Sequence, residues 1–200
     1  MSLNKRTAID LLHSHMQNIN LRRHCYGVSV SMGAIYDYLQ SKGMLLPTEP
    51  VKEVWEIFGV LHDSDYEITK EDWTKHTLIT LDWLKEIGYD VDSDPLCLAI
   101  KSHNNKITNL REPETQMEWA LECCDELSGF IVACALVMPD KKLKDVDFES
   151  VKKKFRSNGF AKAVDREQIA QCSQRLGIEL DDFIEIVLDG MKSNSDWLGL

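Results

Sequence analysis

The sequence contains no CxxC pair, no apolar stretch long enough to cross a membrane and no excess of basic residues. Its six cysteines are scattered, which argues against a structural zinc site of the cysteine type. The longest apolar run, residues 130–138, is far shorter than the roughly 20 residues of a membrane-spanning helix. Lys and Arg number 23 against 33 Asp and Glu, whereas a protein that binds a nucleic-acid polymer needs a positive surface. These absences predict a protein with no membrane partner and no nucleic-acid polymer as partner.

The first ten residues also lack the apolar core of a signal peptide. Most of the cysteines fall within apolar helical patterns, where cysteine behaves as a small hydrophobic residue. We therefore expect reduced thiols and a cytoplasmic location. The oligomeric state is left open by the sequence.

Strand signals, hairpins and internal repeats are missing as well, and apolar residues recur instead at helical spacing. The sequence thus predicts an all-α fold in one domain, residues 1–200, with a core of about 5–138, a basic segment at 139–166 and C-terminal helices at 166–200. The expected helices cover residues 5–19, 21–39, 51–66, 69–88, 95–103, 114–138, 169–176 and 180–191. The start at residue 69 rests on a capping-box pattern, Thr69 with Asp72, and on a hydrophobic staple, Ile68 with Trp73.

A His-Asp doublet ends the apolar segment 51–66, which reads VKEVWEIFGVLHDSDY. His62 continues the apolar stripe one turn after Phe58, so it is expected to point inward. Burying an ionised carboxylate such as Asp63 without partners is costly, so it should be paired, protonated or bound to a cation. Taken alone, the doublet is most simply two residues that cap the end of a helix and hydrogen-bond to its backbone.

Further polar residues lie on apolar stripes elsewhere in the chain, and together with the doublet they make a set of four histidines and two aspartates. The set is His24, His62, Asp63, His76, His103 and Asp125. Each histidine alone is most simply a hydrogen-bonded core residue. Burying six polar side chains at separate places would be costly. If they converge on one point, a divalent cation there would compensate the cost for all of them. Imidazole with carboxylate and no thiolate suits Fe, Mn, Zn or Co.

The order H…HD…H…H…D on successive helices resembles the HD superfamily of metal-dependent phosphohydrolases, which is named for the doublet His62-Asp63. The resemblance covers most of the chain, and the segments GVLHDSDYE, SHN, CCDELSGFIVA and SVKKKFRSNGFA look like a small bacterial-type branch of it. It implies an all-α HD-domain bundle with a central metal site and a C-terminal helical extension. By matching position, His24, His62, Asp63 and Asp125 would hold the defining metal. His76 and His103 match the histidines of members with a second metal, Asp63 then bridging both ions.

The resemblance implies hydrolysis of a phosphoester in a nucleotide or another small phosphorylated metabolite, by water activated on one or two divalent ions (Fe, Mn, Zn, Co or Mg). Asp63 is then catalytic through the metals. Some members carry a further carboxylate three residues after the doublet aspartate; that position is Tyr66 here, and Asp65 lies one residue earlier. We therefore consider Asp65 as a catalytic proton acceptor.

The basic segment at 139–166 has two interpretations. It is either a solvated face, since acidic residues are interleaved in it, or a substrate-phosphate site. The candidates for phosphate binding are Lys141, Lys142, Lys152 and Lys154.

Two alternatives to a phosphohydrolase keep the same ligands. A few proteins with the six-ligand HD arrangement are di-iron oxygenases, and nothing in the residues separates that chemistry from hydrolysis. A metal-binding or ligand-sensing protein without turnover is the third class.

Overall fold

The computed structural model describes residues 3–157 and 159–200, and over these residues the fold is all-helical, as the sequence predicts. The helices are α1 (Lys5–His15), α2 (Ile19–Ser41), α3 (Lys52–Leu61), α4 (Tyr66–Thr69), the 3₁₀ helix η1 (Trp73–Lys75), α5 (Leu78–Glu86), α6 (Pro95–His103), α7 (Asn105–Thr108), α8 (Gln116–Leu136), the 3₁₀ helix η2 (Leu143–Asp145), α9 (Phe148–Phe155), α10 (Arg166–Leu176), α11 (Leu180–Ser193) and α12 (Ser195–Leu198). Within the described residues no helix has both the length and the apolar composition of a bilayer-spanning segment. All six cysteines are buried and free.

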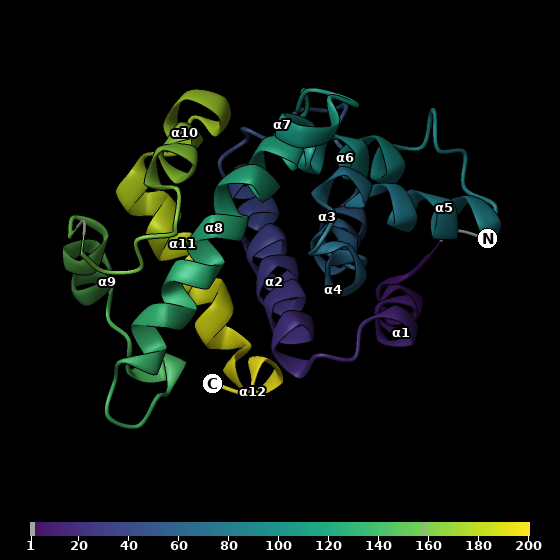
Figure 1. Ribbon diagram of the computed structural model, residues 1–200. Coiled ribbons are helices and arrows are strands. Elements are labelled where there is room, and N and C mark those ends of the chain that lie inside the picture. Colours follow the sequence, from purple (N-terminus) through teal and green to yellow (C-terminus); the bar gives the residue numbers. More distant parts are fainter. Residues whose placement is uncertain (1–2, 158) are drawn as a thin grey trace.

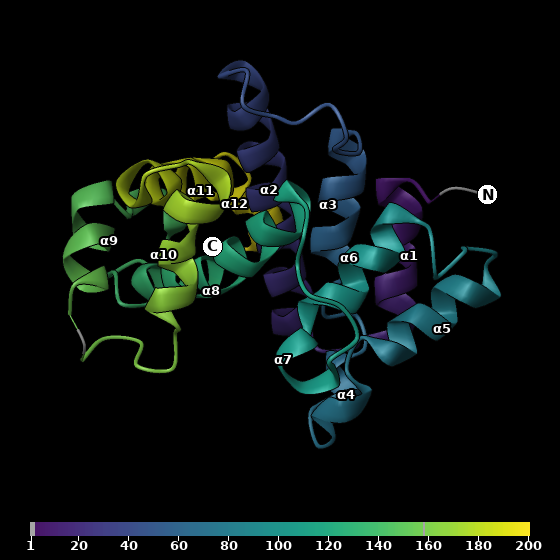
Figure 2. The same cartoon turned by 90° about the horizontal axis from the view of Figure 1, so that it is seen from above.

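The centre of the molecule is α2, with α3 on one side and α8 and α11 on the other (Figure 1). Viewed from above, α1, α5 and α6 lie on the same side of α2 as α3, while α9 and α10 lie towards the opposite edge (Figure 2). The doublet helix α3 is buried through Trp55, Phe58 and Leu61, and it contacts α1, α2 and α6. The residues that end α3 therefore enter the interior.

The long helices begin where the sequence supplies side-chain caps. Asp94 accepts a hydrogen bond from the backbone N–H of Leu96 and precedes Pro95 at the first position of α6, as predicted. Thr115 and Glu118 form a reciprocal capping box at the start of α8. Both helices carry predicted site residues, so these caps help to fix their positions.

α2 and α3 approach each other unusually closely at Gly59. A Cβ atom on Gly59 would lie 2.6 Å from Cα and 2.7 Å from the backbone N of Ser29. The Ser29 hydroxyl donates to the carbonyl of Glu56 at 2.9 Å, which joins the two helices one turn earlier. Because the site residues of α2 and α3 lie close to this crossing, its spacing also sets theirs.

The helix expected to start at Thr69 does not start there. Thr69 instead ends α4, where its hydroxyl donates to the carbonyl of Asp65, and Asp72 caps the short helix η1 through Thr74. The continuous helix begins only at Leu78. The capping-box pattern was therefore misleading, because the intervening residues bring His76 inward through a non-helical backbone.

The C-terminal helices pack on the core helices: α10 contacts α8, and α11 contacts α2 and α8. The segment between α9 and α10 is held by Arg166, whose guanidinium donates to several backbone carbonyls, including that of Phe155 at 2.8 Å. The same guanidinium lies over the rings of Phe130 and Phe155. Arg166 therefore has a structural role.

Candidate metal centre

The six side chains that the sequence singled out come from five places in the fold and meet between α2, α3, α6 and α8. They are His24 in α2, His62 and Asp63 directly after α3, His76 after η1, His103 at the end of α6 and Asp125 in α8. His24 and Asp125, which are most distant in sequence, are in direct contact. The helical stripes therefore predicted the right set of neighbours.

One half of the cluster surrounds Oδ2 of Asp63. Nε2 of His24 lies 2.9 Å from Oδ1 of Asp125 and 3.6 Å from Oδ2 of Asp63. Nε2 of His62 lies 3.6 Å from each of the same two oxygens. Two donors that each lie about 2.1 Å from one ion are at most about 4.2 Å apart. These four side chains therefore fit one divalent ion.

The other half of the cluster surrounds Oδ1 of Asp63. Nε2 of His76 and Nε2 of His103 each lie 3.2 Å from this oxygen. The two carboxylate oxygens of Asp63 thus face two different pairs of histidines. This geometry would allow one carboxylate to be shared between two ions.

The ring of His62 is oriented from behind, since its Nδ1 donates to the carbonyl of Gly59 at 2.9 Å. Its Nε2 is buried, faces the centre of the cluster and has no hydrogen-bond partner. A buried polar nitrogen without a partner is costly in a protein interior. A metal ion at the centre would satisfy this nitrogen.

Asp65 lies behind His76 rather than at the open centre of the cluster. It is fully buried, with one oxygen 2.7 Å from Nδ1 of His76 and the other accepting from the backbone N–H of Thr80 at 3.0 Å. Both oxygens are thus occupied, which does not suit the expected catalytic proton acceptor. Carboxylates in this position fix the tautomer and orientation of a ligand histidine.

Glu122 lies behind His103 in a similar place but without a hydrogen bond to it, and the sequence interpretation missed it. Its Oε1 is buried without a hydrogen-bond partner and lies 3.5 Å from Nδ1 of His103. Its other oxygen accepts from the side chain of Gln168 at 3.0 Å. Glu122 precedes Asp125 by three residues on α8, so their shared helix face was the available signal.

Burial and neighbouring charges act in opposite directions on the pKa values of the cluster residues. Burial alone would lower the pKa of His24, but the hydrogen bond and charge of Asp125 outweigh it and raise the pKa to about 9. Burial alone would raise the pKa of Asp63, yet the neighbouring histidines hold this pKa well below its usual range. Burial would also lower the pKa of His103, but the hydrogen bond and charge of Asp63, together with the charge of Glu122, hold this pKa well above its usual value. The charge distribution of the cluster therefore favours the protonated forms of its histidines and the ionised forms of its aspartates.

Two thiols lie close to the cluster without joining it. Burial, reinforced by the charges of Asp63 and Asp125, raises the pKa of the Cys25 thiol well above its usual value. Burial and the charge of Asp125 do the same for the pKa of Cys124. Since the thiolate is the form that binds metals, these protonated thiols leave a donor set of imidazole and carboxylate.

The backbone is strained directly after His76. Thr77 has a φ of 75°, in the left-handed region that β-branched residues rarely adopt. Its side chain is fully buried, and its hydroxyl has no hydrogen-bond partner. This conformation ends the segment that carries His76 inward.

Two adjoining cavities open onto the cluster. One, of about 270 Å³, reaches His76 and His103, and the other, of about 290 Å³, reaches His24. Both are lined by Asp63, Asp125, Tyr66 and Glu126. The side chain of Asp63 is 16% exposed, so the centre can be reached by a small molecule.

Among the described residues, Lys106 is the lysine that lines these cavities, on the His103 side, and the sequence interpretation did not select it. Trp73, expected on a buried stripe, is 43% exposed at the edge of the same cavity. Lys106 interacts with the side-chain oxygen of Gln168 at 2.5 Å. Over the part of the chain that the structure describes, the polar entrance to the centre therefore carries one lysine beside several carboxylates.

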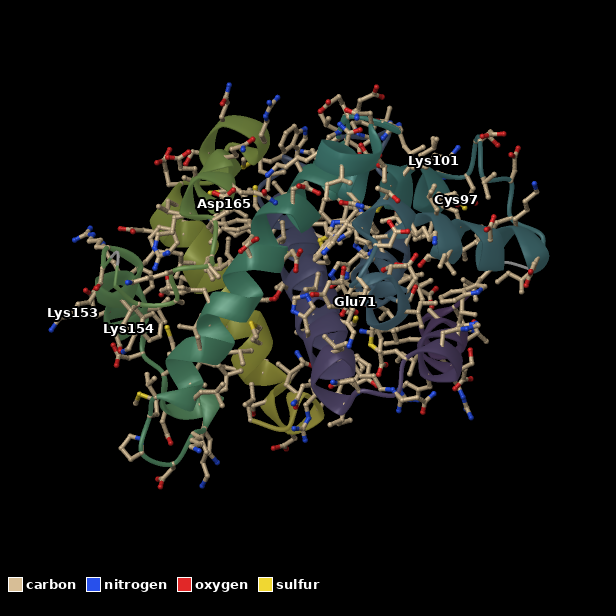
Figure 3. The ribbon with its side chains drawn as sticks, in the orientation of Figure 1. Glu71, Cys97, Lys101, Lys153, Lys154 and Asp165 are labelled. Atoms are coloured by element: carbon tan, nitrogen blue, oxygen red, sulfur yellow. The ribbon has the colours of Figure 1, made fainter. Side chains whose placement is uncertain are left out.

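The four lysines chosen as phosphate ligands are not brought to these cavities. Lys141 and Lys142 are exposed in the turn after α8, and Lys152 is paired with Asp181 of α11. Lys154 contacts the hydroxyl of Ser150, and Figure 3 shows it on α9 at the outer edge, far from Lys101 on α6. The interpretation of the basic segment as a solvated face agrees better with this geometry.

Comparison of the chain with protein-family models, with curated proteins and with solved structures finds no match. The resemblance to the HD superfamily therefore rests on the order of the six residues and on the way the fold brings them together, and membership of that superfamily stays a prediction.

Proposed function

We propose that the protein is a metal-dependent phosphohydrolase that holds two divalent ions and cleaves a small phosphoester. One observation carries the proposal: Oδ2 of Asp63 faces His24 and His62, while Oδ1 of the same carboxylate faces His76 and His103. A shared carboxylate between two sets of ligands is typical of two-metal hydrolytic sites. The resemblance to the HD superfamily points to the same chemistry.

The donor set narrows the choice of metal. Four imidazoles and two carboxylates suit Fe, Mn, Co or Zn better than Mg, which prefers oxygen donors and water. Bound there, two ions would supply a water nucleophile that is deprotonated near neutral pH and positive charge opposite the phosphoryl oxygens. The ligand residues would be His24, His62, Asp63 and Asp125 for the first ion, and Asp63, His76 and His103 for the second.

The protein's own contribution is to fix these ligands and to admit the substrate. The Gly59 carbonyl and the carboxylates of Asp65 and Glu122 each face Nδ1 of one histidine, which leaves Nε2 directed at the centre. We assign Asp65 a positioning role. Lys106, at the entrance, is the cation available to a substrate phosphate.

Metal content is the first test. Protein purified without chelator and loaded with Mn²⁺ should bind about two ions per chain, measured by plasma mass spectrometry. The variant His103→Ala should bind one, because the first set of ligands stays intact. A single ion at saturation in the unmodified protein would contradict the two-ion arrangement and leave His76 and His103 with other roles.

Oxygen dependence separates hydrolysis from the alternative, a di-iron oxygenase. Phosphate release from a panel of nucleotides, sugar phosphates and simple phosphate esters should persist under strict anaerobiosis and with Mn²⁺ in place of iron. Asp63→Asn should abolish it, because this change removes a negative charge between two cations. Oxygen consumption with iron, without phosphate release from any ester, would replace the hydrolase with the oxygenase.

A further inference from the structure

A third cavity, of about 380 Å³, lies between α2, α8, α11 and α12. Its walls are mainly apolar and include Val132, Leu136, Met191 and Leu198. Its volume falls within the range of small-molecule sites, which are mostly apolar with a few polar groups. Nothing in the proposed hydrolytic chemistry uses this space.

The apolar cavity adjoins the metal centre. His24 and Gly129 line both this cavity and the one that contains Asp63 and Asp125. On α8, residues 125, 129, 132 and 136 are separated by four, three and four positions, so they form one face of the helix. This face leads from a proposed metal ligand, past Gly129, to the apolar walls.

Gly129 borders both spaces, and nothing in the fold requires a glycine there. A Cβ atom at this position would meet no other atom within 4 Å, and the backbone lies within the helix α8. At Gly59 and Gly190, by contrast, a Cβ would lie within 3 Å of a neighbouring helix. A glycine inside a helix is destabilising relative to alanine, so this one calls for another explanation.

The charges around the cavity indicate which part of a ligand it would accept. Arg23, packed against the turn at Gly199, and Asn20 contribute polar groups to the lining, and His24 lines both this cavity and the one at the metal centre. Most of the other lining side chains are hydrocarbon. This arrangement suits a molecule with an anionic group at the metals and an apolar chain or ring directed along α8.

We propose that the apolar cavity binds the hydrocarbon part of the substrate, and that Gly129 determines specificity by keeping the passage from the metal centre open. Together with the proposed function, on which it rests for the metal-bound anion, this makes the substrate class a phosphate ester of an apolar alcohol rather than of a sugar or nucleoside.

Two hydroxamates test the passage without relying on phosphate chemistry, because a hydroxamate binds metals whatever reaction the site performs. Calorimetry on the Mn²⁺-loaded full chain would compare acetohydroxamate with hexanohydroxamate. Each buried methylene strengthens binding roughly fourfold. The longer compound should therefore bind at least about tenfold more tightly if half of its extra methylenes enter the cavity.

Gly129→Leu should reduce this preference to less than about threefold while leaving Mn²⁺ content and acetohydroxamate affinity unchanged. Ala170→Leu, which adds similar bulk at an exposed position on α10, is the matched control and should keep the preference. Gly129→Ala is the second variant if the leucine variant does not fold. It should raise the melting temperature and still lower the preference at least twofold.

Equal affinity of the wild-type protein for both hydroxamates, or an unchanged preference in the Gly129 variants, would overturn the inference even if phosphate esters are hydrolysed. Conversely, a chain-length preference that depends on Gly129, in a protein that releases no phosphate from any ester, would retain the apolar cavity and refute the hydrolase. Failure to bind Mn²⁺ at all would overturn both.

Discussion

The carboxylate of Asp65 offers a sharp test of the two-ion arrangement, because Asp65→Asn changes one group and almost no volume. The backbone N–H of Thr80, 3.0 Å from Oδ2, can only donate, so the amide oxygen of asparagine must face it. The amide nitrogen then faces Nδ1 of His76, in place of the oxygen now at 2.7 Å. Because the amide would donate a hydrogen bond to Nδ1, a neutral His76 would carry its own proton on Nε2, the nitrogen that faces Asp63. A protonated Nε2 has no lone pair left to bind a metal.

Loss of such an orienting carboxylate typically weakens metal affinity 10-fold to 100-fold, or about 1.4 to 2.7 kcal/mol. The opposite amide orientation leaves the buried N–H of Thr80 facing a donor, which costs about 1 to 3 kcal/mol. Titration calorimetry with Mn²⁺ should therefore show a second binding step that is weakened about 10-fold to 100-fold and a first step that is unchanged. Asp72→Asn, at a half-exposed carboxylate that caps η1, should leave both steps intact. Two unweakened steps in Asp65→Asn would refute the positioning role.

Two further predictions concern pH and packing. In chelator-treated protein the pKa of His24 is raised from 6.5 to about 9, so the stabilisation from its pairing with Asp125 is complete below pH 6.5 and is lost as pH rises through 9. Urea-unfolding midpoints should fall over this range, and Mn²⁺ affinity should rise over it because the ion displaces the proton. His24→Gln should make both slopes shallower, while the raised pKa of His103 leaves a remainder. Gly59→Ala should destabilise the protein by about 1 to 3 kcal/mol in urea unfolding, because its Cβ would lie 2.6 Å from the backbone of Ser29, which cannot move aside cheaply. Gly129→Ala, whose Cβ has open space, should show no such loss, and equal destabilisation of the two variants would contradict the close-crossing argument.

Helical spacing was enough to predict the fold class and the approximate position of the longer helices. It succeeded because each long helix buries one apolar stripe, and Asp94 before Pro95 is a cap that acts locally. It failed between Thr69 and Leu78, where the tertiary position of His76 overrides a good local capping pattern. Local rules cannot anticipate a backbone bent by a contact with a residue distant in sequence.

The candidate centre was predictable for a related reason. A histidine or aspartate on an apolar stripe costs free energy to bury unless it meets polar partners there. The six central residues could therefore be selected from their positions on such stripes. Residues that act behind or beside them leave no such signal. In the sequence, Glu122 and Lys106 look like ordinary helix residues. The clustered lysines of α9 were considered for phosphate binding, but that role depends on which face of the fold they occupy, and the sequence does not show this.

The strained backbone at Thr77 has an evolutionary consequence. A non-glycine residue held in the left-handed region costs about 1 to 3 kcal/mol, and glycine at this position would remove most of that strain. Selection for thermal robustness alone would therefore favour replacing Thr77. Libraries of random variants screened only for heat resistance should accumulate glycine or asparagine here, whereas libraries screened for metal-dependent turnover should retain residues that keep His76 in place. Comparing the two sets of variants would show whether Thr77 is kept for metal-dependent turnover at the expense of thermal stability.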